Sequence, residues 1–421
     1  MRILLISQYF FTRDQAGSAR LYEFGRMLAA AGHRPVLITT FIDNFRKEVP
    51  EKYRGRWLAR EMVDGLEIIR VRAYAGYRGS YARRIINFLS FAATATLAAL
   101  RSGPCDVVFG TTPPTTVGAV AWLISRLKRR PLIFEVRDLW PEAAVELGLL
   151  RNRPLIAALT AAERFLAQQA RSVIALTPGL KRRLVSGKGI PASKIAVVTN
   201  AMNPEDYGPP TPPEAAKAAR SLSGRFVVMQ AGSIGASDDL HVMVRAAEVL
   251  SRELEFVFVL VGDGDARPGL QQLVRTLGLD NVLFWPTVPR REVPGVLSTA
   301  DVLICQIPGF YGDCALPNRL FDYLAAGRAV ITTGEGDCAE LLLRGQAGLV
   351  VPPGDPQALA AAIRTLRDDP ERCRSLGRNG WSFVREHYSW AAQFPRYLEI
   401  FEAAGGKAAG ASLPASEARS G

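Results

Sequence analysis

The chain has 421 residues, of which 48% are hydrophobic and 22% charged, and this composition excludes wholesale disorder and a multi-span membrane protein. The length exceeds the usual domain of about 100–200 residues and therefore predicts two domains. Charge is uneven, because residues 1–205 hold 31 Lys and Arg against 15 Asp and Glu, whereas residues 206–421 hold 21 against 25. The basic half indicates either an anionic partner (nucleic acid, a phospholipid surface or a diphosphate-linked substrate) or a solvated basic surface.

The first half of the chain predicts a parallel sheet. Residues 2–7 have the pattern of a strand, residues 19–32 of an amphipathic helix and residues 34–40 of a second strand, which together make a βαβ unit. Five further β-branched runs follow, separated by helical patterns: 66–72, 106–111, 131–136, 172–177 and 194–200. Strands that alternate with helices are typical of an α/β domain whose parallel sheet is covered on both faces.

The N-terminal segment and the cysteines favour a cytoplasmic location. The apolar run at the start of the chain is short and lacks a small-residue cleavage site, so it indicates a buried strand and not a signal peptide. The five cysteines are scattered without a C-x-x-C pair, which indicates neither a disulfide framework nor a structural zinc site. We therefore expect a cytoplasmic protein without a metal site.

The longest near-apolar stretch, residues 85–100, is shorter than the roughly 18–20 residues of a membrane-spanning helix and contains Asn87. Arg78, Arg83 and Arg84 precede it, with aromatic residues among and after them. Such a segment can lie in a membrane interface with its basic flank on the headgroups, or it can pack on its own sheet. The first alternative places the protein peripherally at the inner face of the cell membrane.

A run with four prolines, residues 206–214, can neither pair in a sheet nor continue a helix, and it predicts the connection between two domains. Residues 1–205 then form the N-terminal domain, and residues 215–380 form a second α/β domain with its own parallel sheet. The six strands predicted for the second domain are 225–235, 255–264, 281–288, 300–307, 329–333 and 348–353.

The C-terminal region predicts a helix and a tail. Residues 381–403 have a helical pattern and are expected to pack back toward the N-terminal domain. Pro395 should kink or break this helix, because proline lacks the backbone N–H that a helix interior uses. Residues 404–421 are small and polar, which predicts disorder.

Three glycine loops follow predicted strands, at the carboxyl ends where ligands of doubly wound sheets bind. Gly17 lies between the first strand and the first helix. Gly232, Ser233 and Gly235 occupy the equivalent place in the second domain, where close backbone approach and free N–H groups suit a diphosphate. Gly262 lies in the third loop, for which a tight strand exit is an equal alternative.

The segment 317–331, PNRLFDYLAAGRAVI, predicts a short helix that begins at Pro317 and is closed by Gly327. Arg319 and Asp322 lie three residues apart on adjacent turns of this helix. The carboxylate of Asp322 can accept both hydroxyls of a ribose, and Arg319 can form charge-assisted bonds to a diphosphate leaving group. The alternative is an ordinary surface salt bridge between the two side chains.

Nine sequence blocks follow one another in a recognisable order: MRILLISQYF, GSARLYEFGRMLAAAGH, EVRDLWPEAAVELGLL, ALTPGLKRRL, VVTNAM, AGSIG, LVGDGDAR, PNRLFDYLAAGRAVI and GLVVPPGDPQALAAAI. In these blocks the chain resembles the family 4 retaining glycosyltransferases of the GT-B fold, and the resemblance covers roughly residues 1–400. The resemblance is greatest to the branch that builds O-antigen, colanic-acid and capsule repeat units, with its fucosyl- and N-acetylfucosaminyl-transferase-like enzymes. It implies two facing Rossmann-like, doubly wound parallel-sheet domains with a cleft between them.

The resemblance also implies roles for single residues. Asp322 replaces the family's glutamate that binds the donor ribose, and Arg319 stands at the family's usual basic position. Gly17 lies in the loop that faces the donor phosphates. Gly232 and Ser233 would line the diphosphate.

Asp138, in the block EVRDLWPE, would reach the acceptor side of the cleft, with a structural role beside its neighbour Arg137 as the alternative. Two departures from the family pattern stand out. Cys314 occupies the place of a first glutamate, so the contact of that glutamate with the sugar is absent or made by Asp313. Residues 236–241 are acidic where many relatives carry basic residues, which leaves Arg319 and helix dipoles to stabilise the leaving group.

The activity implied by the resemblance is transfer of a sugar from a nucleotide diphosphate donor, a UDP-sugar, to a hydroxyl with retained anomeric configuration and without a metal or other cofactor. The acceptor would be a saccharide, linked to undecaprenyl diphosphate. Two alternatives within the fold are a sugar-nucleotide 2-epimerase and a non-catalytic nucleotide-sugar-binding module. Nucleic-acid binding is not expected, because the sequence shows neither a stacking platform of aromatic and basic residues nor a helix-turn-helix pattern.

Overall fold

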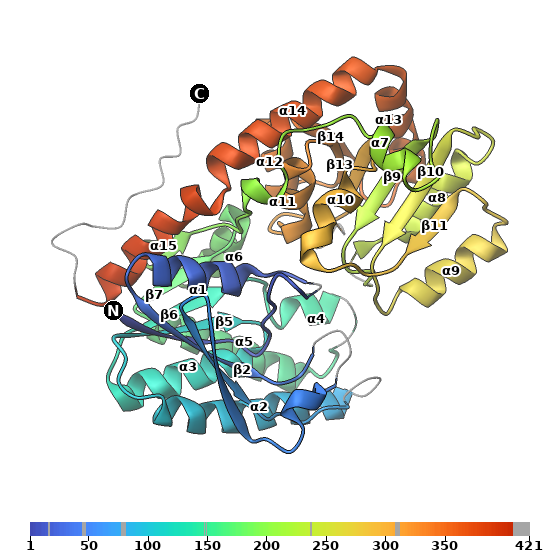
Figure 1. Ribbon diagram of the computed structural model, residues 1–421. Coiled ribbons are helices and arrows are strands. Elements are labelled where there is room, and N and C mark those ends of the chain that lie inside the picture. Colours follow the sequence, from blue (N-terminus) through green and yellow to red (C-terminus); the bar gives the residue numbers. More distant parts are fainter. Residues whose placement is uncertain are drawn as a thin grey trace. The chain divides into compact units, whose positions relative to one another are not determined.

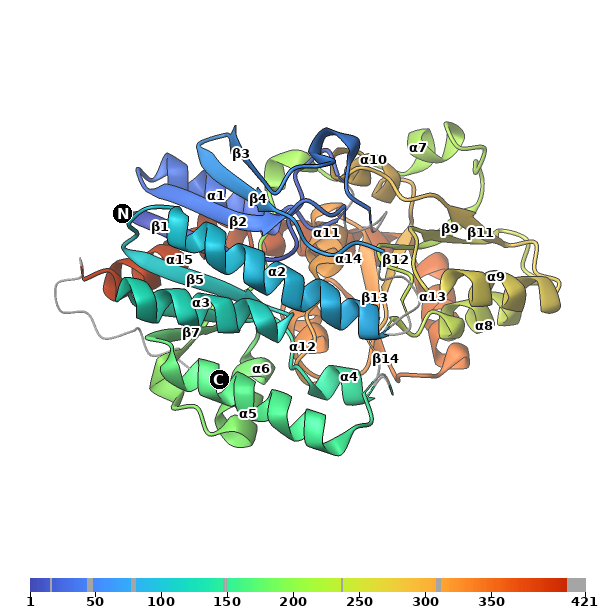
Figure 2. The same ribbon diagram turned by 90° about the horizontal axis from the view of Figure 1, so that it is seen from below.

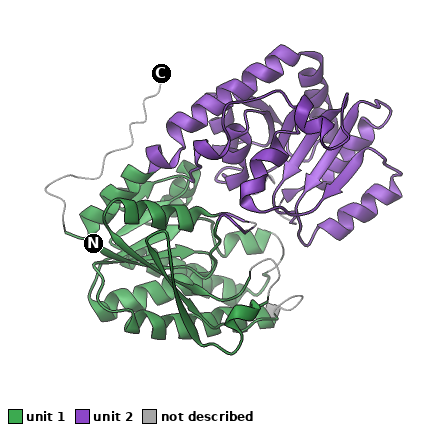
Figure 3. Ribbon diagram, in the orientation of Figure 1, with its two compact units in different colours: residues 1–12, 19–199, 394–421 green, residues 13–18, 200–393 purple. Residues whose placement is uncertain are grey.

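The computed structural model describes residues 1–15, 17–43, 48–76, 81–146, 148, 150–235, 238–307 and 312–406. The chain divides into two compact units, each built around one sheet (Figure 3). Unit 1 comprises residues 1–12, 19–199 and the C-terminal residues from 394 onward, and unit 2 comprises residues 13–18 and 200–393. The short segment 13–18 thus belongs to unit 2, although the chain on both sides of it belongs to unit 1.

The division after Thr199 falls before the proline-rich run 206–214, which therefore lies inside unit 2. In that unit Pro210 lies so close to Gly327 that a Cβ at the glycine would collide with the proline ring. The proline-rich run is thus packed against the helix that carries the PNRLFDYLAAG motif. Of the predicted tail, residues 407–421 lie outside the described residues.

The sheet of unit 1 (Figure 1) has the strand order β3-β4-β2-β1-β5-β6-β7-β8. Its strands are β1 Arg2–Ile6, β2 Arg34–Thr40, β3 Leu58–Val63, β4 Leu66–Val71, β5 Val107–Thr112, β6 Leu132–Val136, β7 Ser172–Ala175 and β8 Ile195–Val197. All the strands predicted for this half are confirmed, and they pair in parallel. The sequence does not predict β3, an antiparallel edge strand whose Leu58 and Met62 are exposed and so give no apolar stripe.

Seven helices accompany this sheet in the described part of unit 1. They are α1 Arg20–Ala30, α2 Tyr81–Arg101, α3 Thr115–Lys128, α4 Glu142–Glu146, α5 Arg153–Gln169, α6 Pro178–Lys188 and α15 Trp390–Ala404, with 3₁₀ turns at Glu51–Tyr53 and Ala192–Lys194. Helices α2, α3 and α5 lie side by side along one face of the sheet (Figure 2).

Helix α2 contains the near-apolar stretch. It packs on its own sheet through Phe91 and Ala95, which are fully buried, as one of the two sequence alternatives requires. Its outer side nevertheless exposes Ile86, Leu89 and Leu97. Within the described residues, no helix is both long and apolar enough to cross a membrane.

The C-terminal helical region is interrupted at Tyr388 and Ser389, between α14 Pro370–His387 and α15. Pro395 lies inside α15, so of the predicted kink or break at this proline the break is wrong. The interruption occurs where Ser389 pairs with Met202 and the backbone leaves the helix to make that bridge. From residue 394 onward α15 belongs to unit 1, where the Tyr397 ring centroid lies 4.8 Å from that of Phe24.

The sheet of unit 2 has six parallel strands in the order β11-β10-β9-β12-β13-β14. They are β9 Phe226–Ala231, β10 Phe256–Val261, β11 Val282–Trp285, β12 Val302–Cys305, β13 Ala329–Thr333 and β14 Gly348–Val351, and all six were expected from the sequence. The strand order reverses between β9 and β12. In doubly wound sheets this reversal marks the crevice at the carboxyl ends of the strands where ligands bind.

The helices of unit 2 pack on both faces of this sheet. They are α7 Glu214–Ala218, α8 His241–Val249, α9 Arg267–Thr276, α10 Val293–Leu297, α11 Asn318–Ala325, α12 Asp337–Arg344, α13 Pro356–Asp368 and α14, with 3₁₀ turns at Pro204–Asp206 and Arg290–Glu292. Alternate residues of β9 enter two separate apolar clusters, since Met229 joins one and Val228 joins the other. The sheet is therefore buried on both faces, so a ligand reaches it only at the ends of its strands.

Candidate nucleotide-sugar site

Two glycine loops lie against each other at the carboxyl ends of β9 and β10. Gly232, which follows β9, has a φ of 148°, and Gly262, which follows β10, has a φ of 133°. A Cβ at Gly262 would collide with the carbonyl oxygen of Gly232. Glycine is therefore required at 262 both for its backbone conformation and for the close approach of the two loops.

Most backbone amides of the loop after β9 already donate hydrogen bonds. The N–H of Gly232 donates to Val261, that of Ile234 donates to Asp263, and that of Gly235 donates to the Oδ2 atom of Asp238 at 2.8 Å. Among the described residues, only the Ser233 amide of this loop has no acceptor in the structure. The loop thus offers an anion one amide and the side chain of Ser233, which is fewer donors than its glycine pattern suggests.

Arg319 lies in the first turn of α11 and extends to this loop. A Cβ at Gly232 would lie 3.6 Å from its Nη1 atom, so the guanidinium is in contact range of the loop backbone. Arg319 forms an ion pair with Asp238, and its Nε atom is buried without a hydrogen-bond partner among the described residues. Burial alone would lower the pKa of Arg319, but the charge of Asp238 raises it above the usual value, so the side chain stays cationic.

Cys305, the last residue of β12, lies beside the same guanidinium. Its thiol is fully buried, and hydrogen bonds from Cys338 and then the nearby charge of Arg319 lower its pKa despite burial. Arg319 therefore has Gly232 after β9 and Cys305 at the end of β12 as neighbours. These two strands flank the point where the strand order reverses, which is the expected ligand position.

Asp322 does not pair with Arg319, so the surface salt bridge considered as an alternative is not the arrangement found. Its Oδ1 and Oδ2 atoms instead accept from Arg290 at 2.5 and 2.6 Å, and Oδ1 also accepts from the hydroxyl of Tyr207 at 2.8 Å. Burial and the charge of Asp322 raise the pKa of Tyr207 well above its usual value, so the phenol remains a donor. Three of about four acceptor positions on the carboxylate are thereby used.

Arg290 and Tyr207 are the residues that sequence reasoning missed. Arg290 follows β11 in the run PRRE, at the same edge of the sheet as the glycine loops, so the rule that selected those loops could have selected it too. Tyr207 gave no such signal, because it lies in the proline-rich run and is brought to Asp322 only by the packing of that run on α11.

Gly17 lies in the segment that belongs to unit 2, with a φ of 119°. The segment is held by hydrogen bonds from the Arg290 amide to the Gln15 carbonyl at 3.3 Å and from Asn318 to the Ser18 hydroxyl at 3.1 Å. An ion pair between Asp14 and Arg291 adds to these contacts. The structure thus brings the Gly17 loop to the residues that flank Arg319 and hold Asp322.

Cys314, which occupies the place of the family's first glutamate, lies in unit 2. The Cys314 side chain is buried, whereas its neighbour Asp313 is exposed. The backbone of residues 312–313 lies against Gly336, where a Cβ would collide with it. Of these two side chains, only that of Asp313 is exposed, and it carries the carboxylate that a sugar contact would need.

Asp138 lies in unit 1, beyond the carboxyl end of β6, and is half-buried. The chain that follows it is held by Lys188 at the end of α6, which donates to the Trp140 carbonyl at 3.2 Å and to Glu142. Lys188 also pairs with the buried Glu163 of α5. Sequence reasoning did not find this lysine, which holds the EVRDLWPE segment in place.

A second buried network of unit 1 was also missed. Glu135 is fully buried in β6, where Arg20 of α1 binds it with two guanidinium nitrogens. Thr111 donates to Glu135 at 2.7 Å, and Tyr397 of α15 donates at 3.1 Å. Burial would raise the pKa of Glu135, but Arg20 holds it below the usual value. The signal was present in the sequence as the single charged residue inside the strand LIFEV.

Within the residues that the structure describes, no group of three or more His, Cys, Asp or Glu side chains is placed to hold a metal ion. The charged groups at the carboxyl edge of unit 2 form mixed pairs of one cation and one carboxylate instead.

Two family models match the chain, one in each half. Residues 16–201 match the model described as "Glycosyl transferase 4-like domain", and residues 225–369 match the model described as "Glycosyl transferases group 1". The second match covers both glycine loops of unit 2, Arg290 and the whole of α11.

Curated proteins with related sequences are glycosyltransferases. The chain is 24% identical to WcaI of Escherichia coli (strain K12), named as a colanic acid biosynthesis glycosyl transferase, over 81% of this chain and 86% of that protein. It is 32% identical to the lipopolysaccharide core biosynthesis glycosyltransferase LpsD of Rhizobium meliloti (strain 1021), over 46% of this chain and 54% of that protein. Identity to the alpha-D-kanosaminyltransferase of Streptomyces kanamyceticus is 24%, over 58% of this chain. The chain spans 63% of that last protein's length.

Solved structures show the same fold over almost the whole chain. Sucrose-phosphate synthase from Thermosynechococcus elongatus superposes with a TM-score of 0.78 at 19% identity, covering 97% of this chain and all of that one. Anabaena Alr3699/HepE, solved in complex with UDP and glucose, superposes with a TM-score of 0.71 at 18% identity, covering 96% and 100%. With a glycosyl transferase 4-like domain followed by a glycosyl transferases group 1 domain, the chain belongs to the GT-B glycosyltransferases.

Proposed function

We propose that the protein is a retaining glycosyltransferase that moves a sugar from a UDP-sugar to a hydroxyl of a lipid-linked saccharide in the synthesis of a cell-surface polysaccharide. The observation that carries the proposal is the buried guanidinium of Arg319, held beside Gly232 where the strand order of unit 2 reverses. Relatives named for colanic acid and lipopolysaccharide core synthesis support the pathway class. HepE, with UDP and glucose, supports the donor class, and the resemblance to the fucosyl- and N-acetylfucosaminyl-transferase-like branch suggests the sugar class.

The chemical task of Arg319 is to stabilise the departing diphosphate. In a retaining front-face transfer the glycosidic bond to the leaving group breaks while the acceptor oxygen attacks from the same side, and the diphosphate takes the acceptor's proton. Fixed positive charge at the leaving oxygens is then the main catalytic contribution. Asp238 holds Arg319 in place before the donor arrives, and the diphosphate replaces part of that contact. The Ser233 amide adds one hydrogen bond, and charge compensation by these groups is the basis for proposing a metal-independent reaction.

Asp322 is the proposed ribose ligand, with Arg290 and Tyr207 as the residues that position it. Because their hydrogen bonds use three of about four acceptor positions, the carboxylate has room for one ribose hydroxyl. The original expectation was a contact with both hydroxyls. We assign the single contact to Oδ2, which accepts from Arg290 alone among the described residues.

The acceptor is assigned to unit 1, with Asp138 as its proposed contact residue. Its position beyond the carboxyl end of β6 is where a doubly wound sheet binds ligands. The outer sides of α2, α3 and α5 support a membrane-attached acceptor, because they expose Leu89, Leu127 and Phe165 in a half of the chain with excess positive charge. Flotation with vesicles that contain anionic lipid tests this part, and a failure to float at low salt contradicts it.

The decisive experiment replaces Arg319 by Ala in a sugar-transfer assay. Loss of a residue that stabilises the leaving group should lower kcat by about 100–1,000-fold. Arg245→Ala is the matched control, because this arginine also lies on a helix of unit 2 and pairs with a carboxylate, Glu248, but at the surface. Turnover of Arg319→Ala equal to that of the control removes the assignment.

Donor identity is tested by thermal unfolding in the presence of UDP-, GDP- and dTDP-sugars. A donor that binds the folded state raises the midpoint in proportion to the logarithm of its concentration over its Kd. UDP-sugars are expected to give the largest shift. The products separate the remaining alternatives, since an epimerase releases a free sugar without any acceptor and a binding module shows a shift without turnover.

A further inference from the structure

Unit 1 has a cavity of about 620 Å³ at the amino ends of β6, β7 and β8. Five cationic side chains line it: Arg126, Arg129, Arg130, Arg171 and Lys194. Each belongs to the chain just before one of these strands, or to the end of α3. Because the strands are parallel, this edge of the sheet is opposite to the carboxyl edge that bears Asp138.

The positive charge of this cavity is not neutralised by carboxylates. None of its lining residues is Asp or Glu. Within the described chain, no ion pair involves any of the five cationic side chains. Lys194 donates to the carbonyl of Gln168, and burial together with the charge of Arg171 lowers its pKa, as expected for a lysine close to other cations.

The ends of two helices do not balance this charge. Helices α3 and α5 both end at the cavity, and each C-terminus carries roughly half a negative charge. The two together supply about one negative charge against five positive ones. Most of the positive charge therefore remains for a ligand or for solvent.

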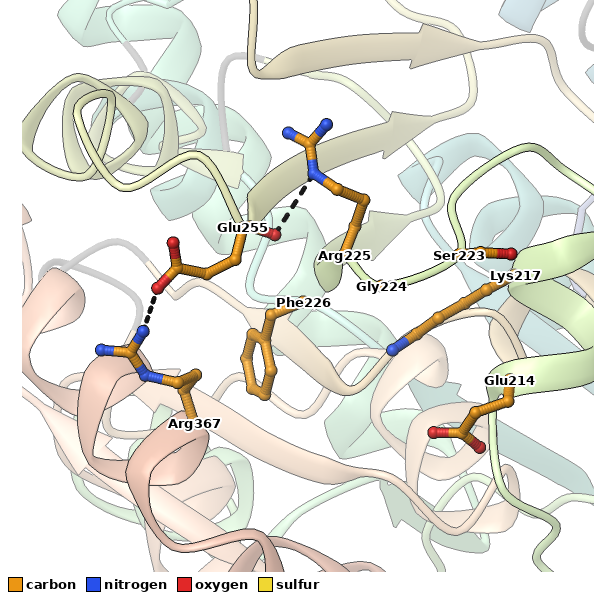
Figure 4. A pocket seen from close by; sticks show the side chains of 8 residues that line it. All are labelled: Glu214, Lys217, Ser223, Gly224, Arg225, Phe226, Glu255 and Arg367. Carbon is orange, nitrogen blue, oxygen red and sulfur yellow. Dashed lines mark hydrogen bonds and ion pairs between the residues drawn. The ribbon is translucent and has the colours of Figure 1, made fainter.

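Unit 2 has a cavity in the equivalent place, and there two of the three lining cations form ion pairs. This cavity, of about 400 Å³, lies at the amino ends of β9 and β10 (Figure 4). Glu214 and Glu255 line it together with its three cations. Arg367 pairs with Glu255, and Lys217 pairs with Asp301 at 2.6 Å. Two of the three cations are therefore neutralised at this amino edge, whereas none of the five is neutralised by an ion pair in the described part of unit 1.

We propose that the cavity of unit 1 binds a phosphate-bearing anion of at least two charges, at a site separate from the donor site of unit 2. Four of its five cations are arginines, whose planar fork binds two phosphate oxygens at once. The phosphate comes either from a free phosphorylated compound or from a lipid headgroup, and both present the same group to the cavity. The proposal does not depend on the function assigned to unit 2.

The test uses the full chain with inorganic pyrophosphate as the probe, measured by isothermal titration calorimetry at low ionic strength. The variant Arg129→Gln/Arg171→Gln/Lys194→Gln removes three cations of the cavity without removing an ion pair among the described residues. Its matched control is Arg34→Gln/Arg54→Gln/Arg56→Gln, which removes three exposed arginines of the same unit. The variant Arg319→Ala shows how much of the pyrophosphate binding occurs at the donor site. Vesicles of phosphatidylglycerol test whether the bound phosphate comes from a lipid headgroup.

In the Arg319→Ala background, where donor-site binding is removed, the cavity substitutions should weaken pyrophosphate binding about 100-fold, since they remove up to three charge-assisted hydrogen bonds. The control variant and Arg319→Ala should retain that binding. A second outcome also supports the site. If the wild type does not bind pyrophosphate but binds the vesicles, and only the cavity variant loses vesicle binding, the phosphate comes from a lipid headgroup. Equal behaviour of cavity and control variants with both probes overturns the proposal, as does loss of pyrophosphate binding in Arg319→Ala alone.

Discussion

The two units use buried charge in different places. In unit 1 the pair of Arg20 and Glu135 lies in the sheet interior, and its partner Tyr397 fastens the C-terminal helix to the sheet. In unit 2 the pair of Arg319 and Asp238 lies at the carboxyl edge, beside a glycine loop. Both pairs are buried, and both hold the cation charged.

The difference shows that burial of an ion pair does not by itself identify a ligand site. The position of the pair relative to the ends of the strands identifies a ligand site, because a ligand reaches only the edge of a sheet that is covered on both faces. The pair in the interior of unit 1 should therefore affect stability, and the pair at the edge of unit 2 should affect turnover.

The largest expected effect is on stability and comes from Glu135→Ala. The variant leaves Arg20 buried without its carboxylate, which should lower the free energy of unfolding by about 3–5 kcal/mol. Urea denaturation measures this loss. Glu248→Ala is the control, since it breaks a surface pair and should cost about 0.5 kcal/mol or less. Similar losses in the two variants would contradict the special role of the interior pair.

The same pair predicts how stability depends on pH. Because Arg20 lowers the pKa of Glu135 in the folded state, the unfolded chain binds a proton more readily than the folded chain. The contribution of Glu135 to stability is therefore complete above the ordinary carboxyl value of 4.5 and is lost as the pH falls through the folded-state pKa. Glu135→Gln should have a flatter profile of stability below pH 4.5 than the wild type, and parallel profiles would contradict the prediction.

A smaller effect is expected from Gly262→Ala, at the edge of unit 2. The added Cβ strains a backbone with positive φ and forces the two glycine loops apart, which should cost roughly 2–3 kcal/mol in stability and weaken nucleotide binding. Gly269→Ala is the control. Its Cβ would meet nothing within 4 Å, and alanine in α9 should add about 0.5–1 kcal/mol of stability. Unchanged nucleotide binding in Gly262→Ala would show that Gly262 does not contribute to the nucleotide site.

The fold follows from the sequence because each predicted strand carries a local signal. Runs such as FVVMQA and FVFVLV are apolar on both sides, as strands of a parallel sheet covered by helices must be. The edge strand β3 has no such run, and only its pairing with β4 makes it a strand. The packing of the proline-rich run within unit 2 could not be predicted for a related reason, since its composition excludes a helix and a strand but says nothing about which unit the run packs on.

The candidate site could be predicted only where one strand end or one helix carries the signal. Gly232 was selected because it lies in a loop that the topology rule singles out, and Arg319 because it lies in a short helical motif that resembles that of the family. The partners of Asp322 could not be found in this way, since Tyr207 and Arg290 lie 115 and 32 residues from it in the sequence. Asp238 illustrates the same limit, because its acidic segment predicted a missing cation but not its pairing with Arg319.

The smallest effect is expected from Tyr207→Phe, and it tests whether Tyr207 positions Asp322 or contacts the nucleotide. The variant removes one hydrogen bond to Oδ1 and leaves both bonds from Arg290, so stability should fall by about 1–2 kcal/mol. The lone pair set free on Oδ1 can then accept a second ribose hydroxyl. The rise in unfolding midpoint that UDP produces should therefore be retained or increased in the variant, whereas its loss in a folded Tyr207→Phe protein would show that the phenol itself binds the nucleotide.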